Sequence, residues 1–181
     1  EWRFQLEEGV PWHNNWGEFT GEDIFHTVAM WQRDDSLLAF SNDWREIDLD
    51  HSTIHSPYDI TLKLKNPNPD YLFIVSPGGG GLVMSKAQWD AEGDEGYEKD
   101  MIGTGPYRYD GRTYGVDINY ELLPDHWRRN NPAPDFQKMQ FQWIAEPATR
   151  AAGLLAGDIH LTEITKDQAR SAVNDSGMKL I

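Results

Sequence analysis

The run Gly103-Thr104-Gly105-Pro106 constrains the fold of this chain most, because two different patterns of apolar residues meet there. Glycine and proline interrupt regular structure. Before the run, alternating apolar residues at 2–6 and 60–64 predict half-buried strands within a stretch that is rich in loops. After it, strands are followed by a helix, a brief strand and a second helix. The sequence therefore predicts an α/β chain with a β-rich part at 1–103 and an α/β part at 104–181.

Two predicted helices have clearly marked ends. One starts at Thr20, whose hydroxyl can cap it and which precedes acidic residues. The other is bounded by Pro147 and Gly157, and we expect its Leu154 and Leu155 to pack on a neighbouring strand. The other predictions are an irregular stretch at 34–56, a buried strand at 71–75, a short helix at 85–91, an acidic loop at 92–100, strands at 107–109, 116–122 and 139–143, a turn at 110–111, a brief strand at 158–161 and a last helix at 165–177.

The charge and the absence of cysteine exclude several classes of function. Acidic residues outnumber basic ones by 30 to 16, which gives a net charge of -14 at pH 7. Phosphate binding needs clustered Lys and Arg, so this charge argues against nucleic acid as a partner. Without cysteine there are no disulfides, thiolate zinc sites or cysteine nucleophiles. With 39% hydrophobic and 25% charged residues, the composition is nevertheless that of a globular protein.

No motif has the spacing that a catalytic or metal site requires. The four glycines at 78–81 are not followed by the Gly-Lys-Ser/Thr of a phosphate-binding loop. The acidic run at 90–101 lacks the central glycine and the final glutamate of a calcium loop. His51 and His55 are close in sequence, but their segment looks irregular, and no Gly-x-Ser-x-Gly elbow occurs. We expect no catalytic residue, no metal and no cofactor.

Tryptophan is abundant, with 8 residues in a chain of 181. Large aromatic rings either pack in a core or stack on a ligand. Trp2, Trp31 and Trp143 fall on periodicities that face a core. Trp12 and Trp44 are expected in loops, where stacking on a sugar or a peptide side chain is an alternative to packing.

Six short motifs follow one another in the order and spacing of the bacterial extracellular solute-binding proteins, family 5. The strongest is Ile102-Gly103-Thr104-Gly105-Pro106-Tyr107, which resembles the family's v-G-T-G-P-Y. Near Asp125-His126-Trp127 the sequence departs from the family, which usually has Asn and Tyr there. The other five matching segments are 2–13 (family F-x-L-R-x-G-V-x-F-H-D-G), 19–24 (F-T-A-E-D-V), 61–69 (v-x-f-x-L-x-x-P-x-P), 120–127 (l-x-x-N-p-x-Y-W) and 148–159 (a-T-R-x-x-a-L-x-x-G-e-i-D).

This resemblance implies part of a periplasmic-binding-protein type II-like fold, in which two hinged lobes close on a ligand. It assigns 1–103 to the β-rich subdomain of the N-terminal lobe, and 104–181 to part of the α/β ligand-facing lobe. Family members are more than twice as long and both ends stop within apolar stretches, so we expect a part of a longer protein. The family also implies solute capture for an ABC permease without catalysis, in the periplasm or outside the cell. A membrane is then reached only through a lipid anchor outside this segment, as in a cell-surface lipoprotein.

The resemblance also places two segments near the ligand, one after the first helix and one after the Gly-x-Asp-Ile strand. At such a strand end, open backbone groups can pair with an extended peptide. We therefore expect a peptide as the solute. An oligosaccharide-binding member of the same family, a glycosidase with a carboxylate pair and a module without activity of its own are the alternatives. The expected ligand-binding residues are Leu38, Phe40 and Trp44 in the first segment, and Thr162, Glu163 and Ile164 in the second.

Overall fold

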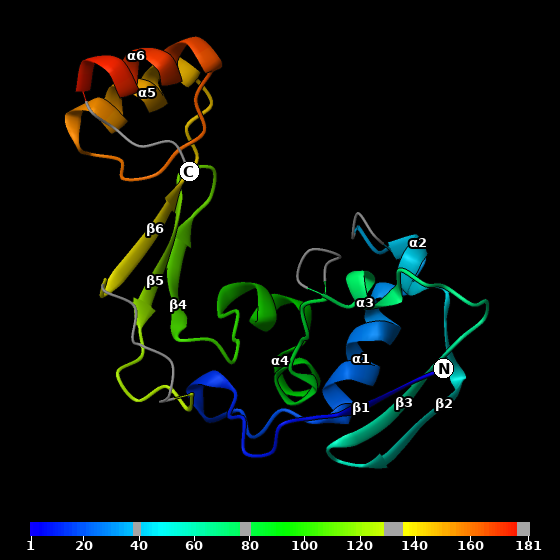
Figure 1. Cartoon of the computed structure of the whole chain (residues 1–181). Coiled ribbons are helices and arrows are strands. Elements are labelled where there is room, and N and C mark those ends of the chain that lie inside the picture. Colours follow the sequence, from blue (N-terminus) through cyan, green and yellow to red (C-terminus); the bar gives the residue numbers. More distant parts are fainter. Residues whose placement is uncertain (38–40, 77–80, 129–135, 177–181) are drawn as a thin grey trace. The chain divides into compact units, whose positions relative to one another are not determined.

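The structure of the chain is a computed structural model that describes residues 1–37, 41–76, 81–128 and 136–176 (Figure 1). It contains helices and two small sheets, which confirms the predicted α/β class. The chain divides into two compact units. The first unit comprises Glu1–Gly111 and Tyr120–Lys138, and the second comprises Arg112–Asn119 and Met139–Ile181. The boundary expected between residues 103 and 104 concerns the subdomains of a longer protein, and it stays a prediction.

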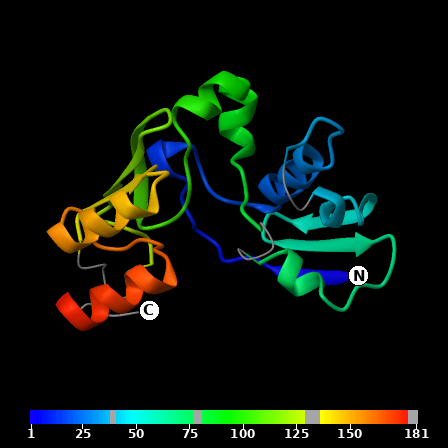
Figure 2. The same cartoon turned by 90° about the horizontal axis from the view of Figure 1, so that it is seen from above.

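The first sheet has the strand order β1-β3-β2, with antiparallel pairing throughout (Figure 2). Its strands are β1 (Trp2–Gln5), β2 (Ile47–Ser56) and β3 (Asp59–Leu64). Phe4 and Ile54 both stand opposite Ile60, which is fully buried in the central strand. Because side chains alternate across a strand, this register turns one apolar face of the sheet towards the core.

Helix α1 (Gly21–Trp31) packs on this sheet and begins where the sequence predicts. Thr20 and Asp23 form a capping box at the start of the helix. The Thr20 side chain accepts a backbone N–H of the first turn, and the Asp23 side chain accepts the backbone N–H of Thr20. Gly21 allows the helix to approach the sheet, since an added Cβ would lie 2.5 Å from Cγ2 of Ile60. The core between helix and sheet consists of Val28, Trp44, Ile47, Ile60, Leu62, Tyr71 and Ile74.

The remaining elements of the first unit correct three predictions. The irregular stretch predicted at 34–56 is wrong in its second half, where β2 forms an edge strand with half of its residues exposed. The predicted strand at 71–75 is the helix α3 (Tyr71–Ile74), whose buried residues are three positions apart. The predicted acidic loop at 92–100 belongs to α4 (Lys86–Lys99), which continues past the short predicted helix through a break at Gly93. The other short elements are η1 (His13–Asn15) and α2 (Ser41–Trp44).

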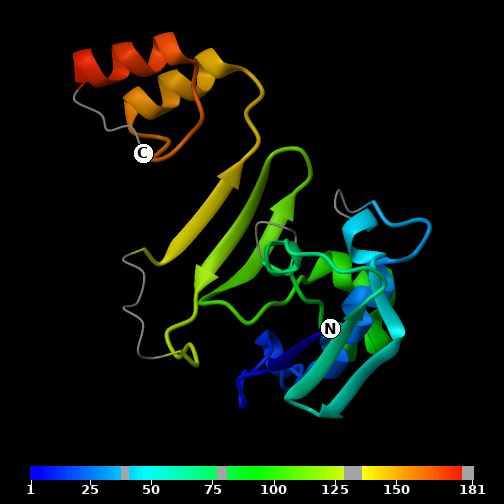
Figure 3. The ribbon, with the colours of Figure 1, turned by 45° about the vertical axis from the view of Figure 1, so that its right-hand side comes forward.

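The second sheet has the order β4-β5-β6, drawn in green to yellow in Figure 3. Its strands are β4 (Tyr107–Thr113), β5 (Asp117–Leu122) and β6 (Lys138–Gln142), close to the three strands that the sequence predicts. The turn expected at 110–111 lies within β4 instead. The chain reverses around Gly115, whose positive φ of 70° suits glycine.

Two helices in contact, α5 (Pro147–Ala156) and α6 (Lys166–Ser176), belong to the second unit. Both agree with the predicted helices, and Gly157 ends α5 in the left-handed conformation. The strand expected at 158–161 is absent, because the N–H groups of Asp158 and Ile159 close a turn on the carbonyl of Gly153. The predicted packing of Leu155 is wrong, since this side chain is 52% exposed. In the described ranges, no helix is both long enough and apolar enough to span a membrane.

Candidate functional site

The first predicted segment contains one described residue, Trp44, because Leu38 and Phe40 lie outside the described residues. Trp44 is the last residue of α2 rather than part of a loop, and it is only 4% exposed. Its ring meets that of Trp31 edge to face, with 4.5 Å between the centroids. Within the first unit, Trp44 therefore packs in the core instead of offering its ring to a ligand.

Trp12 lies outside the helices and strands, as expected, but it is also buried. It is 5% exposed, and its indole N–H donates to the carboxylate of Asp23 at 3.3 Å. The ring lies edge to face against Phe19. Since Asp23 also caps α1, Trp12 contributes to the start of that helix.

An apolar cavity of about 140 Å³ lies beside Trp44 within the first unit. Apolar side chains from α1, β1 and β3 line it together with residues 81–83, and Thr27 is the polar side chain among the lining residues. The indole N–H of Trp44 is buried and has no hydrogen-bond partner among the described residues. Lining residues include Phe4, Ile24, Val28, Trp31, Leu62 and Val75.

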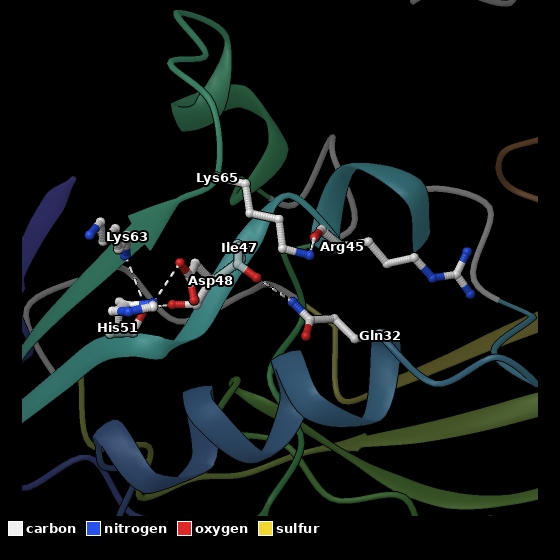
Figure 4. Close-up of polar contacts among 8 residues, drawn as sticks. Gln32, Arg45, Ile47, Asp48, His51, Lys63 and Lys65 are labelled. Atoms are coloured by element: carbon white, nitrogen blue, oxygen red, sulfur yellow. Dashed lines mark hydrogen bonds and ion pairs between the residues drawn. The ribbon is translucent and has the colours of Figure 1, made fainter.

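Polar contacts fix the backbone at Trp44 and just after it, and Figure 4 shows the contacts to Arg45 and Ile47. The amide of Gln32, at the end of α1, donates to the carbonyls of Trp44 and Ile47, both at 2.8 Å. The ammonium of Lys65 donates to the carbonyl of Arg45 at 2.6 Å. These bonds join α1, α2 and β2, so the position of the tryptophan ring is set by three elements.

The two histidines that are close in sequence do not form a metal centre with their neighbours. Nδ1 of His51 lies 2.8 Å from Oδ2 of Asp48, and this hydrogen bond lowers the pKa of the Asp48 carboxyl (Figure 4). His55 bonds instead to the hydroxyl of Thr61 at 2.9 Å. Across the described part of the chain, no three His, Cys, Asp or Glu side chains are grouped so as to hold a metal ion.

The second predicted segment, Thr162–Ile164, connects α5 to α6 in the second unit. Glu163 is exposed, whereas its two neighbours are partly buried. The segment ends at a capping box, in which the N–H of Thr165 donates to Gln168 at 3.0 Å and the Thr165 hydroxyl accepts in return. None of the hydrogen bonds formed among the described residues uses the backbone N–H groups of 162–164.

Arg150 holds the other side of this segment, a role that sequence reasoning missed. From within α5, its Nε donates to the carbonyl of Glu163 at 2.8 Å. Its Nη1 donates to the carbonyls of Ile144 and Ala145 at 2.7 and 2.8 Å. The planar guanidinium thereby ties the chain before α5 to the candidate segment. The signal was present in the Thr149-Arg150 pair of the family motif, which carried no assigned role.

The candidate segment is thus fixed by Arg150 and by the cap of α6. Its N–H groups have no hydrogen-bond partner among the described residues, and Glu163 is exposed. Free N–H groups can pair with carbonyl oxygens of an extended ligand. An exposed carboxylate can pair with an ammonium group. Trp44 and this segment belong to different units, and each is a separate candidate.

Known structures share the fold of the chain. NikZ from Campylobacter jejuni, in complex with Ni(L-His), has a TM-score of 0.80 and 19% identity, over 96% of this chain and 34% of its own. The oligopeptide-binding protein AppA from Bacillus subtilis, with a nonapeptide, has 0.77 and 18%, over 96% and 34%. A dipeptide-binding protein from Pseudoalteromonas sp. SM9913, with Met-Leu, has 0.73 and 17%, over 95% and 37%.

The chain therefore spans about a third of the length of the solved proteins that it matches. No curated protein sequence matches it. The model of the bacterial extracellular solute-binding proteins, family 5 Middle, matches residues 1–180, which is almost the entire chain. This match covers all six motifs that suggested the resemblance, including the run before β4 and the Arg150 segment. The chain belongs to the bacterial extracellular solute-binding proteins of family 5.

Proposed function

We propose that this chain is part of a protein that captures peptides outside the cytoplasm and delivers them to an ABC permease. The observation that carries the proposal is the family match over residues 1–180. Proteins of this family bind solutes and are not enzymes, and AppA and the Pseudoalteromonas protein were solved with peptides. The solute of NikZ, Ni(L-His), is also an amino-acid complex.

The candidate segment Thr162–Ile164 supplies chemistry that suits a peptide. Its backbone N–H groups are available to the carbonyls of an extended chain, as in strand addition. The carboxylate of Glu163 is exposed and can bind the ammonium of a peptide N-terminus or a lysine. Because Arg150 holds the Glu163 carbonyl, the segment keeps its shape without the ligand. Such preorganisation reduces the entropic cost of binding.

We place the chain in one lobe of a hinged receptor, with 1–103 as its β-rich subdomain and 104–181 as part of its ligand-facing lobe. A ligand that contacts both lobes shifts the equilibrium towards the closed state, and the permease can then distinguish loaded from empty receptor. In this proposal the protein resides in the periplasm or on the cell surface, held to the membrane by a lipid anchor at most.

An oligosaccharide is the second candidate, and one observation favours it. Trp143, just after β6, is 80% exposed. An exposed indole face is the platform on which sugar rings stack. We do not propose a glycosidase, because the family to which the chain belongs consists of solute-binding proteins.

A ligand screen by thermal shift separates the two candidates. The complete protein that contains this chain is heated with di- to nonapeptides, with cello-oligosaccharides and without ligand. Bound ligand raises the melting temperature, because it adds about 2.7 kcal/mol to the free energy of unfolding when its concentration is a hundred times Kd. We expect peptides to raise it and Glu163→Gln to weaken the rise for peptides with a free amine. A rise with oligosaccharides only, reduced by Trp143→Ala, would replace peptide by sugar as the solute.

A further inference from the structure

A single histidine in the first unit holds the run that precedes β4. His13, in η1 after β1, is 8% exposed. Its backbone N–H donates to the carbonyl of Gly103 at 3.0 Å. Its ring lies against the same run, with the Gly103 N–H 3.3 Å from Nδ1 and the Gly105 carbonyl oxygen 2.8 Å from Nε2. Three hydrogen bonds thus connect His13 to two residues about 90 positions later, two of them to Gly103 and one to Gly105.

The two ring contacts allow one protonation state. A backbone N–H can only donate, so Nδ1 must carry a free lone pair towards Gly103. A carbonyl oxygen can only accept, so Nε2 must carry the proton towards Gly105. The neutral tautomer with hydrogen on Nε2 satisfies both contacts. The imidazolium would place a second N–H against that of Gly103, and the bond would be lost.

A second clamp holds the middle of the same run. The carbonyl of Thr104 accepts from the indole N–H of Trp127 at 2.7 Å and lies 3.0 Å from Nε2 of His126. This clamp comes from the segment after β5, so the run is held from two sides within the first unit. Trp127 cannot titrate, which leaves Thr104 with a permanent donor when the pH changes.

The titratable groups around His13 come from three parts of the chain. His126 follows β5, Arg108 lies in β4, and Asp100 ends α4. Burial is the largest cause that lowers the pKa of His13, and the interactions with His126 and Arg108 lower it further. The hydrogen bond to Gly105 and the charge of Asp100 act in the opposite direction but do not reverse the shift.

We propose that His13 is an acid-sensitive latch. In its neutral form it fastens the Gly103–Gly105 run to the turn after β1, and protonation of Nδ1 releases that fastening. Nothing in solute binding requires this device, so it stands independently of the proposed function. The latch makes the contact between His13 and the Gly103–Gly105 run sensitive to acid. This run is where the two patterns of apolar residues in the sequence meet.

The sign of the pH effect follows from the direction of the shift. The folded pKa of His13 lies below its ordinary value of 6.5, so the unfolded chain binds the proton more tightly. The stabilisation is therefore complete above pH 6.5, and it decreases as the pH falls towards the folded pKa. Below the folded pKa no further loss comes from this residue.

The test is an NMR titration of the ¹⁵N-labelled chain from about pH 8 to about pH 5, a range in which histidine titrates. Long-range ¹H–¹⁵N correlations identify the tautomer of His13, and amide exchange reports on Gly103. We expect the Nε2–H tautomer at high pH. As His13 titrates, the protection of the Gly103 amide, corrected for the intrinsic exchange rate, should fall about tenfold.

Two variants separate the latch from general acid destabilisation. His13→Gln keeps a donor for Gly105 but cannot titrate, so protection of Gly103 should no longer depend on pH. His160→Gln, at an exposed position after α5, should leave the pH dependence as in the parent chain. An Nδ1–H tautomer, or Gly103 protection that stays constant while His13 titrates, would overturn the proposal. Both of these readouts come from the parent chain, so the proposal can fail even if His13→Gln does not fold.

Discussion

Arg150 binds three backbone carbonyl groups through one guanidinium. Even a conservative substitution of this residue is therefore expected to lower the stability of the chain. Guanidinium is planar and offers several N–H donors in fixed directions, whereas the ammonium of lysine is a compact charge whose three N–H donors are not held in one plane. Arg150 is partly buried, so carbonyls that it abandons would be only partly rehydrated. Its loss would free Glu163 and the chain before α5 together.

We predict that Arg150→Lys lowers the free energy of unfolding by about 1–3 kcal/mol, because charged hydrogen bonds of this kind are lost. Urea denaturation measures the change. Arg170→Lys, at an exposed position in α6, is the matched control and should be within about 0.5 kcal/mol of the parent. Equal stability of both variants would show that the three carbonyl contacts do not stabilise the second unit.

Asp59 gives a second prediction at the scale of single residues. The guanidinium of Arg3 bonds both of its carboxylate oxygens and joins β1 to β3, and it lowers the pKa of Asp59 to about 2. A depressed folded pKa adds stability above the unfolded pKa of 3.8, and this stability is lost as the pH falls towards about 2.

Asp59→Asn should therefore reduce stability at neutral pH and flatten its decline between pH 3.8 and about 2. Thermal unfolding followed at several pH values measures this. Asp110→Asn, on an exposed residue of β4, serves as the control. A variant whose melting temperature declines with acid as steeply as that of the parent would mean that the Arg3–Asp59 pair is not responsible.

Site residues were only partly predictable from the sequence. The segment Thr162–Ile164 could be chosen because its position follows from the family motif. Arg150 belongs to a family motif, but its role could not be assigned, because its partners are backbone carbonyls of three other residues and the sequence does not show which carbonyls come close. Trp44 was expected in a loop because its neighbours are polar, but one turn of helix suffices to direct its ring into the core.

At the scale of elements, the contact of α1 with the first sheet depends on the absence of a side chain at Gly21. A Cβ at this position would come within 2.5 Å of Cγ2 of Ile60, which is fully buried. Alanine normally favours helices over glycine. Here overpacking opposes that preference, and overpacking typically costs more.

We predict that Gly21→Ala destabilises the chain by about 1–3 kcal/mol, measured by urea denaturation. Glu22→Ala, at the next and exposed position of α1, should change stability by no more than about 0.5 kcal/mol. If Gly21→Ala were neutral or stabilising, helix propensity would outweigh the contact, and α1 would not lie as close to β3 as the structure has it.

The elements that the sequence predicted well are those with chemically marked ends. Thr20 caps α1, and Pro147 and Gly157 bound α5, so local hydrogen bonding determines these limits. The polar edge strand β2 and the single-turn helix α3 were missed for a different reason. Their conformation depends on pairing with β3 and on burial of Tyr71 against Trp2, and both are contacts between distant parts of the sequence.

At the scale of the whole molecule, the net charge of -14 opposes compaction. Added salt screens this repulsion, since the Debye length falls from about 30 Å at 0.01 M to about 3 Å at 1 M. We predict that the melting temperature rises when sodium chloride is increased over this range. Sodium chloride is preferable to sulfate, because sulfate also strengthens apolar burial. A melting temperature that falls over the range would show that attractive ion pairs outweigh the net repulsion.

The chain matches about a third of each solved relative. We therefore expect it to bind a solute more weakly by itself than the complete protein does. In a hinged receptor, affinity comes from contacts that both lobes make in the closed state. A ligand held by one lobe alone remains half solvated. If half of the ~8 kcal/mol of a micromolar affinity is lost, the remaining affinity is about millimolar.

The central claim, that this chain is one part of a peptide-capturing receptor, is tested most directly by a pair of calorimetric titrations. One uses the chain of 181 residues and the other the complete protein that contains it, both with the same peptide. We predict that the complete protein binds and that the isolated chain binds about a thousandfold more weakly or not at all. Equal affinities would place the whole site within this chain and contradict the two-lobe account, and a complete protein that binds no peptide would contradict the proposed function.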